Sequence, residues 1–189
     1  PVWTPSSALS AWATAFDLTS LANWQGDAPV LTFNGTSENL VTPDATFWSR
    51  GDAATDSPFS LGWWFKATTA GWPNPAYLFN RFSNVDSVGE WYLRLQTNAG
   101  DNGVELRIHD NSAVTYKRRA GRVAGLGTGV WYFLVATCDG AETSAGLKVY
   151  WNSVESTTYV DNSSGVYVAM ENLTGSTYIG SAADASNYF

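Results

Sequence analysis

Apolar and polar residues alternate with a period of two along most of the chain, which is the pattern of β-strands with one buried face. Turn residues separate these segments at intervals of roughly ten residues, a spacing typical of sandwiches and jelly rolls. The expected strands are Leu31–Phe33, Asn39–Thr42, Phe59–Ala67, Ala76–Phe82, Glu90–Thr97, Val104–His109, Thr115–Arg119, Gly129–Cys138, Gly146–Asn152, Val166–Met170 and Thr177–Gly180. The sequence therefore predicts an all-β fold, a two-sheet antiparallel jelly-roll sandwich.

Two neighbouring tryptophans in the segment FSLGWWFK must lie on opposite faces of their strand. We predict that Trp63 faces the core and Trp64 the outside of its sheet. A large aromatic ring there either borders a ligand groove or is covered by another segment. Residues 1–28, which contain Trp3, Trp12 and Trp24, are the expected cover. The predicted organisation is a Trp-rich leader, 1–28, docked on a jelly-roll domain, 29–189.

Two strands differ in how their faces are expected to be covered. Gly129–Cys138 is apolar on both faces, which predicts a central strand covered on both sides. In Val104–His109 the polar face carries Glu105, Arg107 and His109, and we expect that face to be solvated.

Charge and composition exclude several classes of protein. The chain of 189 residues has a net charge of −7 and a pI of about 4.5, whereas general nucleic-acid binding needs a basic surface. No apolar run reaches the roughly 18 residues of a membrane span. Cys138 is the single cysteine, so no internal disulfide or cysteine-based metal site is expected.

The residues needed for hydrolysis are missing from the pattern. Hydrolases on related folds place two carboxylates along one strand, as E-x-D-x-x-E or E-x-D-x-E, and retaining glycosidases hold them about 5–5.5 Å apart. No glutamate has an aspartate two residues later; the glutamates are Glu38, Glu90, Glu105, Glu142, Glu155 and Glu171. A serine–histidine–aspartate site would depend on His109, the single histidine. The sequence therefore predicts a protein that is not an enzyme.

The order of four segments resembles the laminin-G-like, concanavalin A-like jelly-roll superfamily. These segments are LTFNGTSENLVTP, FSLGWWFKAT, GVWYFLVATCDGAETSAGLKVYWNSV and TYIGSAADASNYF. Cys138 and Ser153 depart from its common tyrosine and glycine. The leader VWTPSSALSAWATAF is similar to lead-ins of such domains on phage virion proteins. The resemblance implies two stacked antiparallel sheets, and members include glycan-binding modules, adhesion domains and virion accessory proteins.

The resemblance also implies two features near the chain ends. One further strand usually follows the last segment and pairs with the opening strand, Leu31–Phe33. We therefore expect either that the 189 residues are a fragment or that this strand is supplied by further sequence, by residues 1–28 or by a neighbouring subunit. Related jelly rolls often carry one structural calcium ion, and oxygen ligands for it are available at Asn34, Glu38 and Asp184. The alternative is that these are ordinary turn residues.

Four aromatic residues are candidates for glycan or partner binding: Trp72, Tyr116, Trp48 and Trp64. Trp72 lies in the proline-rich loop AGWPNP, where it could stack on a sugar or anchor an interface. A basic stretch, YKRRAGR, contains Lys117, Arg118, Arg119 and Arg122 and forms a solvated face or meets an anionic partner.

These observations together predict a non-catalytic binding or adhesion module with a lectin-like fold on an extracellular assembly. A virion accessory or decoration protein is the leading context, and a carbohydrate-binding module of a secreted bacterial protein is the alternative. The expected partners are a glycan or a protein surface, including copies of the chain itself or a capsid, at an extracellular or virion surface.

Overall fold

The computed structural model describes residues 31–67, 75–83, 88–98, 101–122, 127–161, 163–182 and 188–189. The chain divides into two compact units, Pro1–Thr32 and Phe33–Phe189, and the second unit contains all of the strands described below. Within the described residues the only helical element is the 3-10 turn η2 (Ser144–Gly146), and no helix there is long and apolar enough to cross a membrane.

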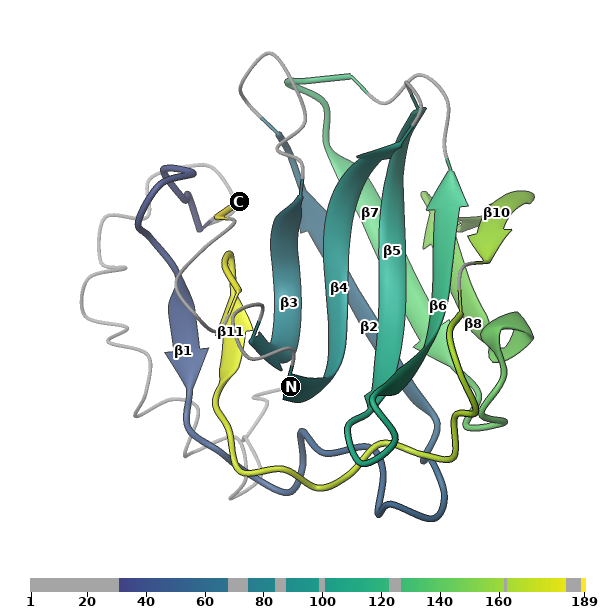
Figure 1. The fold of residues 1–189 in the computed structure, drawn as a ribbon. Coiled ribbons are helices and arrows are strands. Elements are labelled where there is room, and N and C mark those ends of the chain that lie inside the picture. Colours follow the sequence, from purple (N-terminus) through teal and green to yellow (C-terminus); the bar gives the residue numbers. More distant parts are fainter. Residues whose placement is uncertain are drawn as a thin grey trace, which may run out of the picture. The chain divides into compact units, whose positions relative to one another are not determined.

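The second unit consists of two antiparallel sheets. The larger has seven strands in the order β1-β11-β3-β4-β5-β6-β10. Its strands are β1 (Leu40–Thr42), β3 (Ala76–Ser83), β4 (Val88–Asn98), β5 (Asp101–Asp110), β6 (Thr115–Arg122), β10 (Thr158–Asp161) and β11 (Thr177–Ile179). Figure 1 looks onto the side of this sheet that faces away from the other one. The four-stranded sheet has the order β2-β7-β8-β9, formed by β2 (Phe59–Phe65), β7 (Tyr132–Cys138), β8 (Leu147–Trp151) and β9 (Val154–Glu155).

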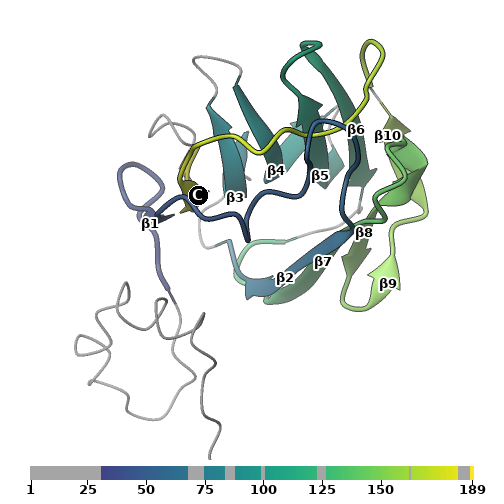
Figure 2. The ribbon, with the colours of Figure 1, turned by 90° about the horizontal axis from the view of Figure 1, so that it is seen from below.

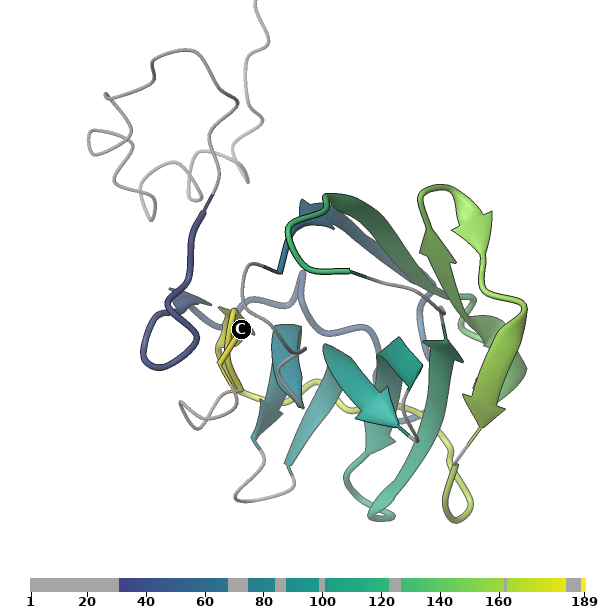
Figure 3. The same cartoon turned by 90° about the horizontal axis from the view of Figure 1, so that it is seen from above.

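The core lies between these sheets, which form two layers when seen along their edges (Figures 2 and 3). Aromatic rings of the two sheets pack against each other: the ring centroids of Phe59 and Trp91 lie 5.8 Å apart, and those of Trp63 and Phe79 lie 5.7 Å apart. The alternation in β4 places Trp91, Leu93 and Leu95 on this side, all fully or almost fully buried. This confirms the all-β prediction of two antiparallel sheets packed as a β-sandwich.

Most of the expected strands are present, but Val166–Met170 and Leu31–Phe33 are not strands. The segment Val166–Met170 has roughly alternating buried and exposed side chains, yet two of its backbone amides donate hydrogen bonds to side chains. Val168 donates its amide hydrogen to Asp110, and Met170 donates to the buried carboxylate of Asp56. An extended segment with such partners needs no neighbouring strand.

The first strand of this unit is β1, and Leu31–Phe33 does not form the expected opening strand. Leu40 pairs with Ile179 of β11, whereas Phe33 contacts the ring of Phe189 at 6.5 Å. The proposed pairing of a final strand with Leu31–Phe33 therefore has no opening strand at that position.

The four-stranded sheet also corrects two expectations about coverage. β7 is central, between β2 and β8, but only Leu134, Ala136 and Cys138 are buried, and the alternate side chains are half-exposed. β7 is therefore covered on one face only. β2 is an edge strand, so Trp63 faces the core as expected but is half-buried.

Candidate functional site

An aromatic surface lies on the outer side of the four-stranded sheet. We call it the Trp64 face and define it by Trp64, Phe133, Val135 and Tyr150. Trp64 pairs with Phe133 across β2 and β7, and Val135 pairs with Tyr150 across β7 and β8. Because directly opposite residues of an antiparallel pair share a face, these side chains lie together.

Trp64 is 62% exposed, the largest exposed aromatic area on this face. Its ring lies 5.2 Å from that of Phe133 at an interplanar angle of 34°. The neighbouring Gly62 is exposed and has no side chain to stand above these rings. The prediction that Trp64 lies outside the core is therefore confirmed. Its cover by residues 1–28 concerns a segment outside the described residues.

A second candidate site lies on the other sheet, on the face that Figure 1 shows over β4, β5 and β6. We call it the arginine–tyrosine cluster and define it by Tyr92, Arg94, Glu105, Arg107, His109 and Tyr116. Cross-strand pairing assembles it: Tyr92 is opposite Arg107, Arg94 opposite Glu105, and His109 opposite Tyr116. Since Trp91 and Leu93 point to the core, these residues point away from it.

Hydrogen bonds and ion pairs order the cluster. The Tyr92 hydroxyl donates to Oε1 of Glu105 at 2.6 Å, and Nη1 of Arg107 donates to the Tyr92 hydroxyl at 3.0 Å. Nη2 of Arg94 lies 3.3 Å from Oε1 of Glu105. Burial raises the pKa of Tyr92 above its ordinary value, and Glu105 adds to this effect. The Tyr92 hydroxyl therefore keeps its proton at neutral pH and donates a hydrogen bond to Glu105.

Each arginine of the cluster also stacks on tyrosine rings. The guanidinium carbon of Arg107 lies 3.4 Å from the centroid of Tyr116, and that of Arg94 lies 4.9 Å from the centroid of Tyr92. Such cation–π contacts fix the planes of both guanidinium groups. Tyr92 is fully buried, while Arg94, Arg107 and Tyr116 keep part of their surface exposed.

His109 is buried and not solvated as the sequence suggested. It is 6% exposed, stacked on Phe82 with the ring centroids 4.3 Å apart, and 5.8 Å from the ring of Tyr116. Burial, together with the positive charges of Arg107 and Arg94, lowers the pKa of His109 to about 2. The imidazole is therefore neutral at physiological pH. Glu105, expected on a solvated face, is fully buried as well.

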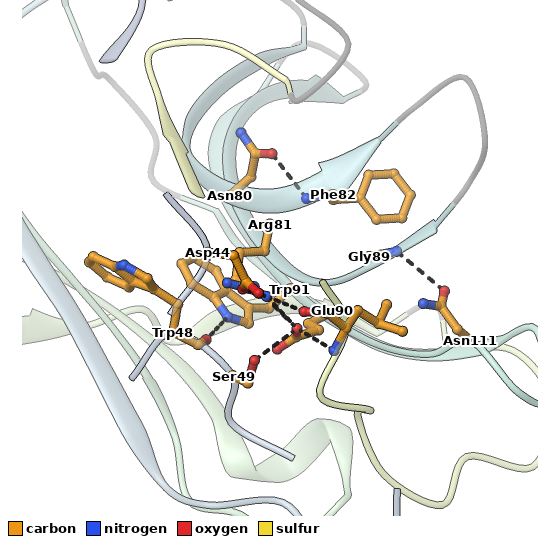
Figure 4. Close-up of polar contacts among 11 residues, drawn as sticks. Asp44, Trp48, Ser49, Asn80, Arg81, Phe82, Gly89, Glu90, Trp91 and Asn111 are labelled. Atoms are coloured by element: carbon orange, nitrogen blue, oxygen red, sulfur yellow. Dashed lines mark hydrogen bonds and ion pairs between the residues drawn. The ribbon is translucent and has the colours of Figure 1, made fainter. Parts of the chain in front are cut away.

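A buried ion pair forms a third polar centre (Figure 4). Nη2 of Arg81 on β3 lies 2.9 Å from Oε1 of Glu90 on β4 and 3.0 Å from Oδ1 of Asp44. The same Glu90 oxygen accepts hydrogen bonds from the Ser49 hydroxyl and from the Leu173 amide. Burial raises the pKa of Glu90, although the positive charge of Arg81 opposes that effect. The group attaches two long connections to the end of the large sheet, which is a structural role.

The remaining predicted binding residues are placed as follows. Trp48 is 8% exposed, packs edge-on against Phe79 at 5.2 Å, and accepts a hydrogen bond from Trp91 through its carbonyl, so it belongs to the core. Trp72 lies outside the described residues. Lys117, Arg118, Arg119 and Arg122 lie on β6, and the side chains of the three arginines are likewise outside the described part.

Two of the proposed calcium ligands are engaged within one turn. Oδ1 of Asn34 accepts the backbone hydrogens of Thr36, Ser37 and Glu38, and Oε2 of Glu38 accepts the hydrogen of Asn34 at 2.8 Å. Such hydrogen bonds between side chains and nearby backbone amides are typical of turn residues. Asp184 lies outside the described residues, and in the described part no group of three acidic, histidine or cysteine residues is arranged for a metal ion. The calcium site stays a prediction from the resemblance.

Sequence reasoning missed Tyr92 and Arg94 as site residues, along with the buried pair of Arg81 and Glu90. The signal was present in the spacing of WYLRLQ and ELRIHD, which a hairpin between Asn98 and Asp101 brings into register. Comparisons of the chain with protein families, with curated proteins and with solved structures found no match.

Proposed function

We propose that this protein is a non-catalytic binding or adhesion module with a concanavalin A-like jelly-roll topology. The two antiparallel sheets and the order of the motifs around Trp63, Trp131 and Asn152 support this assignment. Three buried carboxylates of the described part, those of Asp56, Glu90 and Glu105, each accept hydrogen bonds from side chains or backbone groups of the protein. Such engagement is typical of structural carboxylates.

The observation that carries the proposal is the exposed Trp64 on an open sheet face. A soluble protein rarely exposes a large aromatic ring among other apolar side chains unless that surface binds something. Trp and Tyr are the residues most enriched at the centres of interfaces. The four members of the Trp64 face are uncharged, and Glu155, directly opposite Tyr150, borders them, so the face suits a partner with an apolar surface and a polar edge.

The leading context is an extracellular assembly, in particular a virion accessory or decoration protein, which the leader sequence supports. There the Trp64 face contacts copies of the chain or another protein of the particle. The alternative is a carbohydrate-binding module, which the stacking geometry of Trp64 and Phe133 favours because sugar rings bind on aromatic faces.

Trp64→Ala tests the proposal, with Val154→Ala as the matched control. Val154 is an equally exposed apolar residue, 67% exposed, on β9 of the same sheet. Self-association is measured by sedimentation velocity, and binding to cellulose, chitin and xylan by co-sedimentation. We expect the wild type to show one of these interactions and Trp64→Ala to weaken it by at least about tenfold, the effect of removing an interface hot spot.

The result distinguishes the two contexts. Self-association lost in Trp64→Ala supports the assembly role, and polysaccharide binding lost in Trp64→Ala supports the carbohydrate-binding role. The proposal is wrong if Trp64→Ala and Val154→Ala behave alike, if the wild type shows neither interaction, or if the protein cleaves a glycan.

A further inference from the structure

Three buried nitrogen atoms on the arginine–tyrosine cluster have no hydrogen-bond partner among the described residues. They are Nε of Arg94, Nε of Arg107 and Nε2 of His109. A buried polar atom without a partner costs free energy, and native structures rarely keep several in one place without a reason. His109 is more than nine-tenths buried, so this unpaired nitrogen belongs to a side chain that the fold holds in place.

The same face carries an uncompensated positive charge. Arg94 is paired with Glu105, whereas Arg107 donates to the neutral Tyr92 hydroxyl and has no ion pair with a carboxylate of the described residues. The cluster thus contains two guanidinium groups, one carboxylate and one neutral imidazole. In a chain with a net charge of −7, this face is locally positive.

The register extends the cluster across the sheet. Tyr178 of β11 is opposite Asn80 of β3, Asn80 is opposite Tyr92, and Tyr92 is opposite Arg107. One row across four strands therefore consists of tyrosine, asparagine, tyrosine and arginine. Arg94 and Arg107 of the arginine–tyrosine cluster are partly exposed, so a ligand can reach their guanidinium groups.

We propose that the arginine–tyrosine cluster is a binding site for a single carboxylate group carried by an acidic sugar. A guanidinium group presents parallel N–H donors that match a carboxylate. The stacking of Arg107 on Tyr116 holds that donor edge in one orientation, so little side-chain freedom is lost on binding. The neighbouring Nε2 of His109, which has no partner among the described residues, is suited to a hydroxyl group of the sugar ring.

The overall charge selects against a polyanion. The chain is acidic as a whole, and at physiological salt its charges act over about 8 Å. A densely charged chain such as a nucleic acid would meet this repulsion along its length, whereas one carboxylate on an otherwise neutral glycan meets mainly the cluster. The ligand class is therefore a glycan with an isolated acidic residue. This site is on the opposite sheet from the Trp64 face and is independent of the function proposed above.

The test compares sialyllactose with lactose, which differ by one carboxylate-bearing sugar, by titration calorimetry on the full chain. We expect sialyllactose to bind at least about tenfold more tightly than lactose. Arg107→Gln should reduce sialyllactose binding by roughly ten- to hundredfold, the effect of losing a charge-assisted hydrogen bond. Lys148→Gln removes a half-exposed cation from the other sheet and should leave binding unchanged.

Further variants keep the result interpretable. Arg107→Lys retains the charge without the planar fork, so it should fold and still lose most of the affinity. Trp64→Ala should bind sialyllactose as the wild type does, which separates this site from the Trp64 face. Equal binding of the two sugars, no binding of either, or full affinity in both Arg107 variants would overturn the proposal.

Discussion

His109 is expected to make the protein less stable as the pH falls, because the folded state does not accept a proton on this imidazole. In the unfolded chain histidine has its ordinary pKa of about 6.5. In the folded protein burial lowers the pKa of His109 to about 2. Between these values the unfolded state binds one proton more than the folded state, so stability is lost as the pH falls below 6.5.

The magnitude follows from this difference alone. Each pH unit below 6.5 costs about 1.4 kcal/mol, because one proton is bound only after unfolding. From pH 7.5 to pH 5.0 the contribution of His109 therefore falls by about 2 kcal/mol. The value does not depend on the exact pKa in the folded state, provided that it lies well below 5. The range ends above the pI of about 4.5, where solubility is lowest.

Other groups titrate in the same range, and a variant isolates the histidine. Burial raises the pKa values of Asp56 and Glu90, so each binds its proton more readily in the folded state and opposes the trend. In His109→Gln these contributions persist while the imidazole is gone. Urea unfolding followed by tryptophan fluorescence gives the free energy of unfolding of both proteins at pH 7.5, 6.5, 5.5 and 5.0. The advantage of the wild type should shrink by about 2 kcal/mol over this series.

A second readout confirms the protonation state directly. His109 is the single histidine, so its imidazole resonances in the NMR spectrum are assigned without further labelling. They should not shift between pH 8 and pH 5. A constant stability difference between wild type and His109→Gln, or a titration midpoint near 6.5, would refute the buried, neutral imidazole.

Three further predictions concern stability and are measured by chemical denaturation at pH 7.5. Glu90→Gln should cost about 3–5 kcal/mol, because it removes the buried charge that faces Arg81 and leaves this arginine paired with the more exposed carboxylate of Asp44; a loss below about 1 kcal/mol would contradict this. The exposed pair of Lys148 and Glu155 is the control, and Lys148→Gln should cost less than about 1 kcal/mol. Trp63→Ala should cost about 2–3 kcal/mol and Trp64→Ala less than about 1 kcal/mol; the reverse order would show that the two faces are misassigned. Gly51→Ala should cost about 1–3 kcal/mol, because its Cβ would lie 2.1 Å from the Met170 carbonyl oxygen. Gly175→Ala, where nothing lies within 4 Å of the added atom, should change stability by less than about 0.5 kcal/mol, and equal losses at the two positions would argue against the close approach at Gly51.

The strands could be predicted from the sequence because the alternation that identifies them is local. Val104, Leu106 and Ile108 are fully buried as the pattern indicated. The same alternation failed at Val166–Met170, because it reports which side chains are buried and not what the backbone bonds to. The partners there are carboxylates 58 and 114 residues away in the chain, Asp110 and Asp56. No local pattern contains that information.

The prediction that the polar face of β5 is solvated was wrong for a related reason. Alternation identifies Glu105, Arg107 and His109 as one face, and the structure agrees. Whether that face is solvated depends on what the neighbouring strands place beside it. Phe82 stacks on His109, and Tyr92 bonds to Glu105, both through side chains of other strands. The pairing of β3 with β4 also contains two register shifts, so the position of Phe82 could not be obtained by counting residues.

The arginine–tyrosine cluster and the Trp64 face differ in whether buried charges hold their side chains in place. A buried ion pair contributes little net stability compared with well-packed apolar residues, and its better-supported effect is to fix one arrangement. Arg81 with Glu90 fixes the loops at the end of the large sheet. Arg94 with Glu105 holds the carboxylate that accepts the Tyr92 hydroxyl, and that hydroxyl in turn accepts from Arg107. The orientation of the Arg107 guanidinium therefore depends on a chain of contacts that ends in a buried pair. Among the described residues no such network orders the Trp64 face, where strand pairing and the contact between the rings of Trp64 and Phe133 set the positions of the side chains. A surface of the first kind suits a ligand recognised by the position of its charge, and one of the second kind suits a partner recognised by area.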